Sequence, residues 1–498
     1  MSQAAIRQRV HPLAVTAAVH RITWRIWFND VARSLGSRAK ARTLILAILA
    51  AIAAWTVWSS LELGKQLGLD PETGREIAAP VASVMFAMPA LATLMAVLYA
   101  PDRTLLSEML SVLPVKESHV RGATRWLTVA VGFCGGLVVS APLALQFVFT
   151  GSFSVALAGV GYALFAALLG CLTTQLLTEL MQVGAARFLG RSGVMAQGIG
   201  GLITAALLLY AFMSSMPING SDGKGVLLPL GDVLAWFLGG QIPAWWVLCL
   251  VGGALPVLLI ALDALEAVPR KESAPWRPRL GRPPASSSNS PTFMLLELRQ
   301  WLRYPPNAVL LLFINGLCAA AVVAVALTGG DELGVFYVAL GVASAVGIGC
   351  YGPTRRHHWL YRVTGSPTAW IGPKFRAVLM IWAVMMAVYG TAFMLVSGAG
   401  PVEILLALPM LFVELCASCA LGLLLPVSRD QSIGGAVSEA VAVVGLLGLT
   451  FGLQSMLAAS ANLLTSLAIQ LAMMGAAFGW YLLTAKWLAL HRTEMASA

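Results

Sequence analysis

Long apolar runs alternate with short polar connections along nearly the whole chain. A bilayer-spanning helix needs about 20 consecutive apolar residues, and these runs are too long and too uniformly apolar for the alternating strands of a barrel. The pattern predicts an all-α polytopic membrane protein with about twelve transmembrane helices. The expected spans lie at about 43–62, 77–100, 127–148, 153–181, 199–216, 243–265, 307–328, 333–352, 377–398, 401–425, 433–455 and 463–485.

Composition excludes most other classes of protein. Of the 498 residues, 58% are hydrophobic and only 11% are charged, whereas soluble domains carry about 25% charged residues. Soluble enzymes and nucleic-acid-binding modules do not have this composition, and disordered chains combine low hydrophobicity with high net charge. The chain therefore belongs in a membrane, and we expect lipid rather than nucleic acid around it.

The basic residues predict the orientation. With a cytoplasmic N-terminus, every one of the 32 Lys and Arg residues except Lys65, Arg75 and Lys224 falls on the cytoplasmic side of the expected spans. Cytoplasmic loops of membrane proteins carry such an excess, which also accounts for the net charge of +10. We expect both termini in the cytoplasm, and the richness in Ala, Gly and Arg favours a bacterial cell membrane.

The chain divides into two similar halves. A polar linker at 268–291, rich in Pro and Ser, separates a first six-helix half at 1–267 from a second at 292–498. Arg25-Ile-Trp27 precedes the first expected span, and Arg299-Gln-Trp301 precedes the seventh. Short amphipathic segments of this kind suit helices that lie along the membrane surface. Because six spans are an even number, the two repeats have the same orientation.

Two basic cytoplasmic loops stand at matching places in the halves. Pro101-Asp102-Arg103 follows the second span, and Pro353-Thr354-Arg355 follows the eighth. A second proline comes at a similar distance in each, at Pro114 and Pro367. The matched positions favour docking elements for a cytosolic partner, and the alternative is ordinary positive-inside charge.

Some polar side chains lie inside expected spans, where they are costly and therefore candidates for function. Glu414 and Glu439 lie within spans ten and eleven, and Glu179, one helical turn after Gln175, lies near the cytoplasmic end of span four, as Asp263 does in span six. They either make interhelical hydrogen bonds or line a substrate path. Because no Lys or Arg lies within any expected span, we expect no ion pair inside the membrane.

Motifs for catalysis and metal binding are missing from the sequence. The Cys416-x-x-Cys419 pair has no second Cys or His pair at zinc spacing, so we read the cysteines as packed thiols and expect no metal. No protease, hydrolase or phosphate-cradling motif occurs. We therefore expect no catalytic residue and no cofactor bound by this chain, and any ATP would be bound by another chain.

Taken together, the segments resemble the permeases of ABC-2 type exporters. Residues 24–33 and 297–303 match the family's amphipathic connecting helices. Residues 102–116 look like its coupling helix, with an acidic-basic start followed by Leu-x-x-Leu-Pro and a basic residue, and residues 355–374 look like a degenerate second copy. Thr354 stands where the first copy has Asp102, so the halves are not equivalent.

This resemblance implies a transport subunit that lacks its own ATPase site. One chain would form the whole pathway for a hydrophobic or amphipathic substrate (a drug, a peptide or a lipid), and two copies of a cytosolic nucleotide-binding ATPase would carry ATP and Mg. The implied partner-coupling residues are Asp102, Arg103, Glu108, Leu113, Pro114, Lys116, Arg355, Arg356, Pro367 and Lys374. The connecting-helix residues are Arg25, Trp27, Arg299 and Trp301, and the candidate translocation path comprises Gln175, Glu179, Glu414 and Glu439.

Three other functions remain open from the sequence. A proton-coupled secondary transporter can also have six plus six spans, but its family has a short Gly-x-x-x-Asp-Arg-x-Gly-Arg-Arg loop after span two, where this chain continues Asp102-Arg103-Thr-Leu-Leu. A membrane-embedded enzyme would need converging polar catalytic residues. A purely structural membrane protein is the third alternative.

Overall fold

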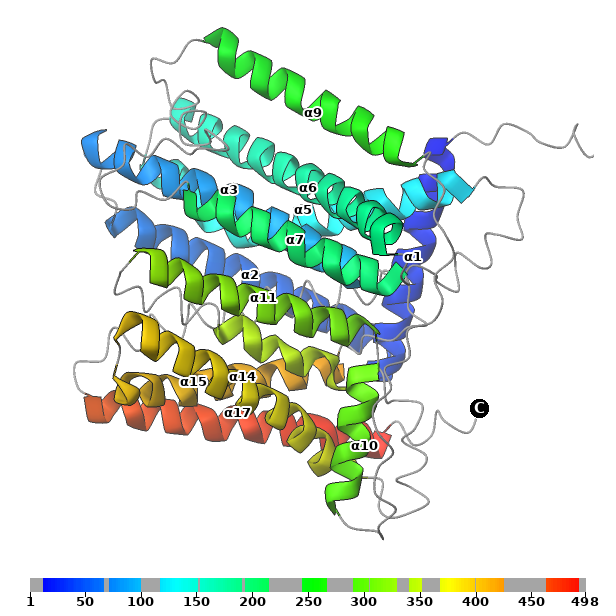
Figure 1. Cartoon of the computed structure of the whole chain (residues 1–498), viewed down its shortest axis with the longest axis vertical. Helices are drawn as coiled ribbons and strands as arrows, with labels where there is room; N and C mark the ends of the chain where they lie inside the picture. Colours follow the sequence, from blue (N-terminus) through cyan, green and yellow to red (C-terminus); the bar gives the residue numbers. More distant parts are fainter. Residues whose placement is uncertain are drawn as a thin grey trace, which may run out of the picture. The chain divides into compact units, whose positions relative to one another are not determined.

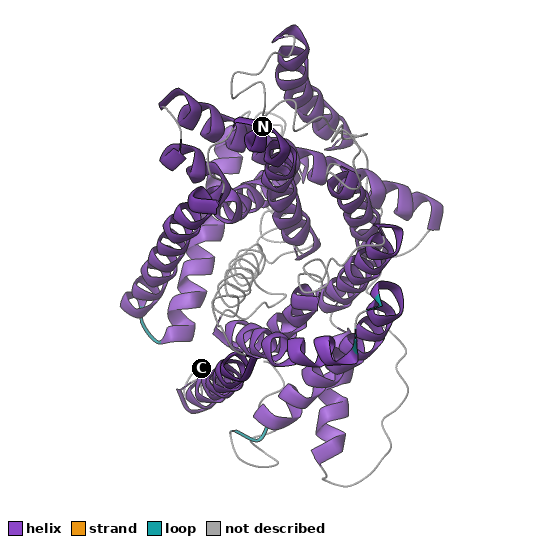
Figure 2. Ribbon diagram, turned by 90° about the vertical axis from the view of Figure 1, so that its left-hand side faces the viewer, coloured by secondary structure: helices purple, strands orange, loops and turns teal. Residues whose placement is uncertain are grey.

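The computed structural model describes most of the helical part of the chain. The described residues are 12–66, 71–99, 117–150, 153–189, 193–214, 244–266, 290–303, 305–328, 340–351, 368–398, 400–424 and 463–491. Helices make up nearly all of them, and Figure 2 shows no strand in this part of the chain. The expected all-helical class is therefore confirmed.

The helices fall into two compact units. Unit 1 contains α1 (Pro12–Leu35, of which the part to Ala32 belongs to this unit), α2 (Arg38–Gln66), α3 (Pro71–Tyr99), α5 (Glu117–Thr150), α6 (Phe153–Leu189), α7 (Gly193–Ser214) and α9 (Ala244–Glu266). Unit 2 contains α10 (Ser290–Arg303), α11 (Pro305–Thr328), the 3₁₀ helix η1 (Ser344–Cys350), α14 (Ile371–Ser397), α15 (Pro401–Leu424) and α17 (Leu463–His491).

Four segments of the described chain are long and apolar enough to cross a bilayer. They are Ala156–Phe188 in α6, Ile371–Ser397 in α14, Ile404–Leu424 in α15 and Thr465–Leu490 in α17. A helix satisfies all of its backbone hydrogen bonds internally, which is what a segment in hydrocarbon requires. The chain is thus a multi-pass helical membrane protein.

One expected span has a different local structure. In the run at 333–352, the described residues form a helical turn at 340–343 and then the 3₁₀ helix η1. A Cβ at Gly347 would collide with Ser418 of α15, and a Cβ at Gly349 with Asn307 of α11. Glycine has a low helix propensity, and these close approaches account for its presence here. The run at 433–455 lies outside the described residues.

A tight corner joins α1 to α2. Gly36 has a φ of 80°, a left-handed conformation that ends helices and that glycine adopts without strain. The Ser37 hydroxyl then accepts a hydrogen bond from the Lys40 backbone N–H at 3.2 Å, which is the usual way of capping a helix N-terminus. The corner therefore brings the end of α1 against the first turns of α2.

One helix in each unit runs across the others. Figure 1 shows α1 crosswise to α2, α3, α5, α6 and α7 of unit 1, and α10 crosswise to α11, α14, α15 and α17 of unit 2. These are the two segments with the Arg-x-Trp sequence. In α1, Arg25 and Trp24 are exposed, whereas Trp301 of α10 is buried against the protein. The two crosswise helices therefore differ in how their aromatic residues are covered.

The core of unit 1 depends on two glycines of α5. Helix α3 packs against α5, α6 and α7. Gly132 and Gly136 are one turn apart on α5, and a Cβ on either would collide with α3, at Thr93 and at Pro89. This small-x-x-x-small spacing lets two membrane helices approach closely enough for van der Waals contact along their backbones.

We expect Gly132→Ala to destabilise the protein, because the added methyl group must displace the α3 backbone. Overpacking of this kind costs about 1–3 kcal/mol. Gly184→Ala is the matched control, since nothing lies within 4 Å of its Cβ position and alanine raises helix propensity at both sites. Thermal unfolding in detergent measures both variants, and equal melting temperatures for the two would contradict the close α3–α5 contact.

Candidate functional site

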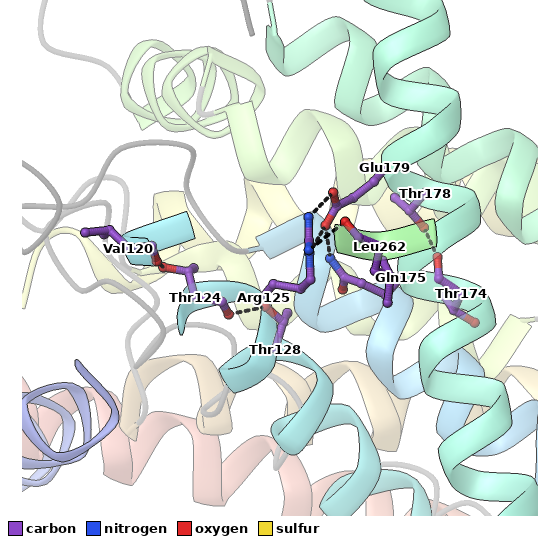
Figure 3. Close-up of polar contacts among 9 residues, drawn as sticks. All are labelled: Val120, Thr124, Arg125, Thr128, Thr174, Gln175, Thr178, Glu179 and Leu262. Carbon is purple, nitrogen blue, oxygen red and sulfur yellow. Dashed lines mark hydrogen bonds and ion pairs between the residues drawn. The ribbon is translucent and has the colours of Figure 1, made fainter. Parts of the chain in front are cut away.

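A buried polar face on α6 forms the centre of unit 1. Thr174, Gln175, Thr178 and Glu179 fall on one side of this helix, and all four are buried. Thr178 satisfies its hydroxyl locally by donating to the Thr174 carbonyl at 2.7 Å. Gln175 and Glu179, one turn apart, project toward the neighbouring helices α5 and α9 (Figure 3).

Arg125 of α5 holds both oxygens of the Glu179 carboxylate with one edge of its guanidinium. Its Nε donates to Glu179 Oε1 at 2.7 Å, and its Nη2 donates to Oε2 at 2.8 Å. Its Nη1 donates to the Leu262 carbonyl of α9 at 3.0 Å, and Gln175 Nε2 donates to Glu179 Oε1 at 2.8 Å. One arginine therefore joins three helices, as Figure 3 shows.

This pair is shielded from water. The side chains of Arg125 and Glu179 are 8% and 6% exposed. A two-pronged arginine–carboxylate contact is the strongest and most directional form of ion pair. Removing one partner of such a pair leaves an uncompensated buried charge, which costs about 3–5 kcal/mol. The arrangement is therefore a structural joint, with both charged groups already engaged.

The expectation that no basic residue pairs with the span carboxylates is wrong at Glu179. The expected span began at residue 127, but α5 begins at Glu117, so Arg125 lies well inside the helix. The prediction is wrong because an apolar run ends at its first charged residue, whereas the helix continues beyond that residue. Arginine has a long apolar stem, which allows its charged head to reach a partner from within a buried helix.

Lys374 is the corresponding cation of unit 2. Its Nζ donates to Glu297 Oε2 at 2.9 Å and to the Cys350 carbonyl at 3.1 Å. Both charged side chains are at most 3% exposed. The lysine thus ties its own helix α14 to the crosswise helix α10 and to the last residue of η1.

Two aromatic rings complete this joint. Tyr351 directly follows η1, and Trp370 directly precedes α14; their ring centroids lie 5.5 Å apart. Lys374 Nζ lies 5.9 Å from the Tyr351 centroid and 5.7 Å from that of Trp370, within the range of cation–π attraction. The residues at both ends of segment 352–367 are therefore held against the same lysine. We call Glu297, Cys350, Tyr351, Trp370 and Lys374 the lysine joint.

A second set of contacts supports the lysine joint from within unit 2. Asn307 Nδ2 donates to the Trp301 and Gly349 carbonyls at 3.3 and 3.2 Å, which binds the end of α10 to η1. Ser344 receives a hydrogen bond from Trp382 Nε1 at 3.1 Å and donates to the Leu411 carbonyl at 3.1 Å. The 3₁₀ segment is thus bound to α11, α14 and α15.

The expected site residues end up in different surroundings. Gln175 and Glu179 come together in the Arg125 network, and Lys374 is buried in the lysine joint. Glu414 is 1% exposed in α15, where a Cβ on Gly341 would come 2.9 Å from its Oε2. Of the expected path carboxylates that the structure describes, Glu179 belongs to unit 1 and Glu414 to unit 2.

Several predictions lie outside the described residues. They are the loop residues Asp102, Arg103, Glu108, Leu113, Pro114, Lys116, Arg355, Arg356 and Pro367, and Glu439; the Asp263 side chain is likewise not described. Sequence reasoning missed Arg125 and Glu297. The available signal was the presence of charges of both signs within or close to the apolar helices, although nothing in one sequence says which charges meet.

Comparison with known proteins gives no relative. No protein-family model, no curated protein and no solved structure matches the chain. Within the described residues, no group of three His, Cys, Asp or Glu side chains is arranged to hold a metal ion. The two buried ion pairs are therefore the features on which a function must be argued.

We expect Arg125→Leu to lower the free energy of unfolding by about 3–5 kcal/mol, because Glu179 keeps a buried charge without its partner. The double variant Arg125→Leu with Glu179→Leu removes both charges, and we expect it to recover most of the loss. Thermal unfolding in detergent measures the stability of each variant. Arg187→Leu is the control, because Arg187 is exposed. A double variant no more stable than Arg125→Leu would contradict the pairing.

We expect Lys374→Met to open the lysine joint locally and to expose Cys350, whose side chain is buried in the intact protein. Because the buried ion pair no longer holds the joint closed, we expect N-ethylmaleimide to label this thiol roughly 100-fold faster. Peptide mass spectrometry measures the labelling rate. The double variant Lys374→Met with Glu297→Met leaves no unpaired buried charge and should bring the labelling back toward the slow rate. Cys318 of α11, also buried, is the internal control, since we expect its labelling to rise only if unit 2 unfolds more widely.

Proposed function

We propose that this chain is the membrane-spanning permease of an ATP-driven exporter in a bacterial cell membrane. Its twelve helices form two six-helix halves of the same orientation, with both termini in the cytoplasm. Two copies of a cytosolic ATPase, which bind ATP and Mg, dock on the loops at 101–116 and 352–367. The resemblance to ABC-2 permeases supports this assignment, together with the way in which the helices beside those loops are joined.

The lysine joint is the observation that carries the proposal. Segment 352–367 is the second proposed docking loop, and Lys374 binds residues on both sides of it as well as Glu297 of α10. A force applied to this loop therefore acts on α14, η1 and α10 together. Because packed protein interiors are hardly compressible, such a joint transmits displacement instead of absorbing it.

Unit 1 offers a comparable route. The proposed docking loop at 101–116 leads directly into α5, whose early turns contact α1 through a hydrogen bond from His20 Nε2 to the Ala123 carbonyl at 3.1 Å. Two residues further on, Arg125 joins α5 to α6 and α9. A push on the loop would therefore move these helices as one body with the crosswise helix.

In the proposed cycle, ATP binding draws the two ATPases together and displaces both loops. The joints convert these displacements into tilts of the two halves, which close the inner side of the pathway and open its outer side. The substrate is hydrophobic or amphipathic. Glu179 is already bound by Arg125, so its part in this scheme is to hold the helices together.

One observation favours a second function, proton-coupled transport. Glu414 is buried in the apolar helix α15, and intramembrane carboxylates are the residues from which proton relays of transporters are built. A transporter of this kind works without ATP. The two functions therefore differ in the energy source that drives transport.

We expect the chain, purified in mild detergent from its native membrane, to bring down a nucleotide-binding subunit, and the complex to move substrate in proteoliposomes only with ATP. Arg103→Ala and Pro114→Ala should reduce that association severalfold, because both alter the docking loop. Arg191→Ala is the control, since it lies in another expected cytoplasmic connection. Lys374→Met should leave association intact and lower the substrate moved per ATP hydrolysed.

The opposite outcome is equally specific. Transport by the chain alone, driven by a proton gradient without ATP and abolished by Glu414→Gln, would replace the exporter with the proton-coupled function. If the Arg103→Ala and Pro114→Ala variants both bind the nucleotide-binding subunit as well as the unaltered chain does, the loop at 101–116 is not part of the docking surface.

A further inference from the structure

Four arginines surround an open pocket in unit 1. The pocket has a volume of about 560 Å³ and lies between α1 and the first turns of α2. Its lining consists of Arg21, Trp24, Arg25, Phe28, Asn29, Arg38 and Arg42. We call it the arginine pocket. No acidic side chain belongs to this lining, so its charge is strongly positive.

The positions of the arginines follow from the helix repeat. Arg21 and Arg25 lie one turn apart on α1, and Arg38 and Arg42 lie one turn apart at the start of α2. The corner at Gly36 brings these two pairs together. Asn29 accepts a hydrogen bond from Arg38 Nη2 at 3.4 Å, so the polar amide lies beside one of the guanidinium groups.

Without an anion this arrangement is unfavourable. Like charges one turn apart on a helix repel each other. The N-terminus of a helix carries a partial positive charge, and the first turn of α2 contains Arg38 but no acidic residue. The same features favour a bound phosphate, since guanidinium groups bind phosphate oxygens in pairs and helix N-termini bind anions.

An exposed apolar surface begins where the arginines end. Leu46, one turn after Arg42 on α2, is 65% exposed, and exposed Val57 and Leu61 continue along the same helix. On α1, Trp24 is 45% exposed at the pocket itself. A soluble phosphate compound would contact the arginines alone, whereas a lipid would also cover this apolar strip with an acyl chain.

We propose that the arginine pocket binds the phosphate headgroup of an acidic membrane lipid, with an acyl chain lying along the exposed apolar strip of α2. The site does not depend on the proposed ATPase partner. Bound lipid offsets part of the positive charge of the four arginines and anchors α1, the crosswise helix of unit 1, to the lipid at the start of α2.

The test uses the full chain, purified in detergent and stripped of lipid, with binding followed by native mass spectrometry. We expect phosphatidylglycerol to bind in preference to phosphatidylcholine. Each arginine near a phosphate contributes about fivefold in affinity, so Arg38→Gln with Arg42→Gln should weaken phosphatidylglycerol binding about 30-fold. The control pair Arg187→Gln with Arg303→Gln removes the same charge from two other exposed arginines and should have little effect.

Two further measurements separate lipid from soluble phosphate. Glycerol 3-phosphate and inorganic phosphate should displace the lipid only weakly, and Leu46→Ser should weaken the binding of phosphatidylglycerol but not of glycerol 3-phosphate. If the soluble phosphates bind as tightly as the lipid does, the lipid assignment is overturned. Equal loss of lipid in the control pair would reduce the effect to general surface charge and also overturn it.

A measurement on the unaltered protein guards against variants that fail to fold. A photoactivatable phosphatidylglycerol, cross-linked in nanodiscs of phosphatidylcholine, should label peptides of α1 and the first half of α2. Labelling spread evenly over the exposed helices, with no enrichment at these peptides, would contradict a specific site.

Discussion

The rest of this structure depends on the requirement that a charge removed from water must be paired. Both units meet it in the same way, with a cation in the early turns of a long helix and a carboxylate from a helix distant in the sequence. Arg125 binds Glu179, and Lys374 binds Glu297. In a membrane, apolar side chains contact lipid as favourably as they contact another helix, because lipid is as apolar as they are. Apolar packing alone therefore does little to select which helix faces meet. The ion pairs supply this selectivity.

Small residues allow such contacts to form. Gly132 and Gly136 bring α5 onto α3, and Gly422 of α15 lies against the Ile348 carbonyl of η1, where a Cβ would collide. Gly341 leaves the space that the Glu414 carboxylate occupies. At the α5–α3 and α15–η1 contacts the missing side chain shortens the distance between two backbones, and at Gly341 it makes room for a carboxylate. Close approach and polar pairing therefore act together, since a hydrogen bond reaches only about 3 Å.

Much of the fold could be predicted from the sequence, because apolar runs of helical length are a local property. The predicted ends of the helices are less accurate: α5 begins at Glu117, ten residues before the apolar run. The 3₁₀ helix η1 was not predicted, since its small and apolar residues also suit a regular helix. The partner of Arg125 could not be predicted either, because Glu179 lies 54 residues away and periodicity within one sequence carries no information about such pairs.

The two halves differ where their repeats match. Aligning Arg25 with Arg299 places the buried, uncharged Thr23 where α10 has Glu297. Aligning Pro114 with Pro367 places Arg121 where α14 has Lys374. At these aligned positions the ion pair that fastens α10 to α14 thus has no counterpart, and the described contact between α1 and α5 is the hydrogen bond from His20. A hydrogen bond to a backbone carbonyl lacks the second charged partner that strengthens an ion pair. At these aligned positions the first crosswise helix is therefore the less firmly fastened of the two. An exporter built from these halves would respond unequally to two identical ATPases, with unit 2 following its loop more closely.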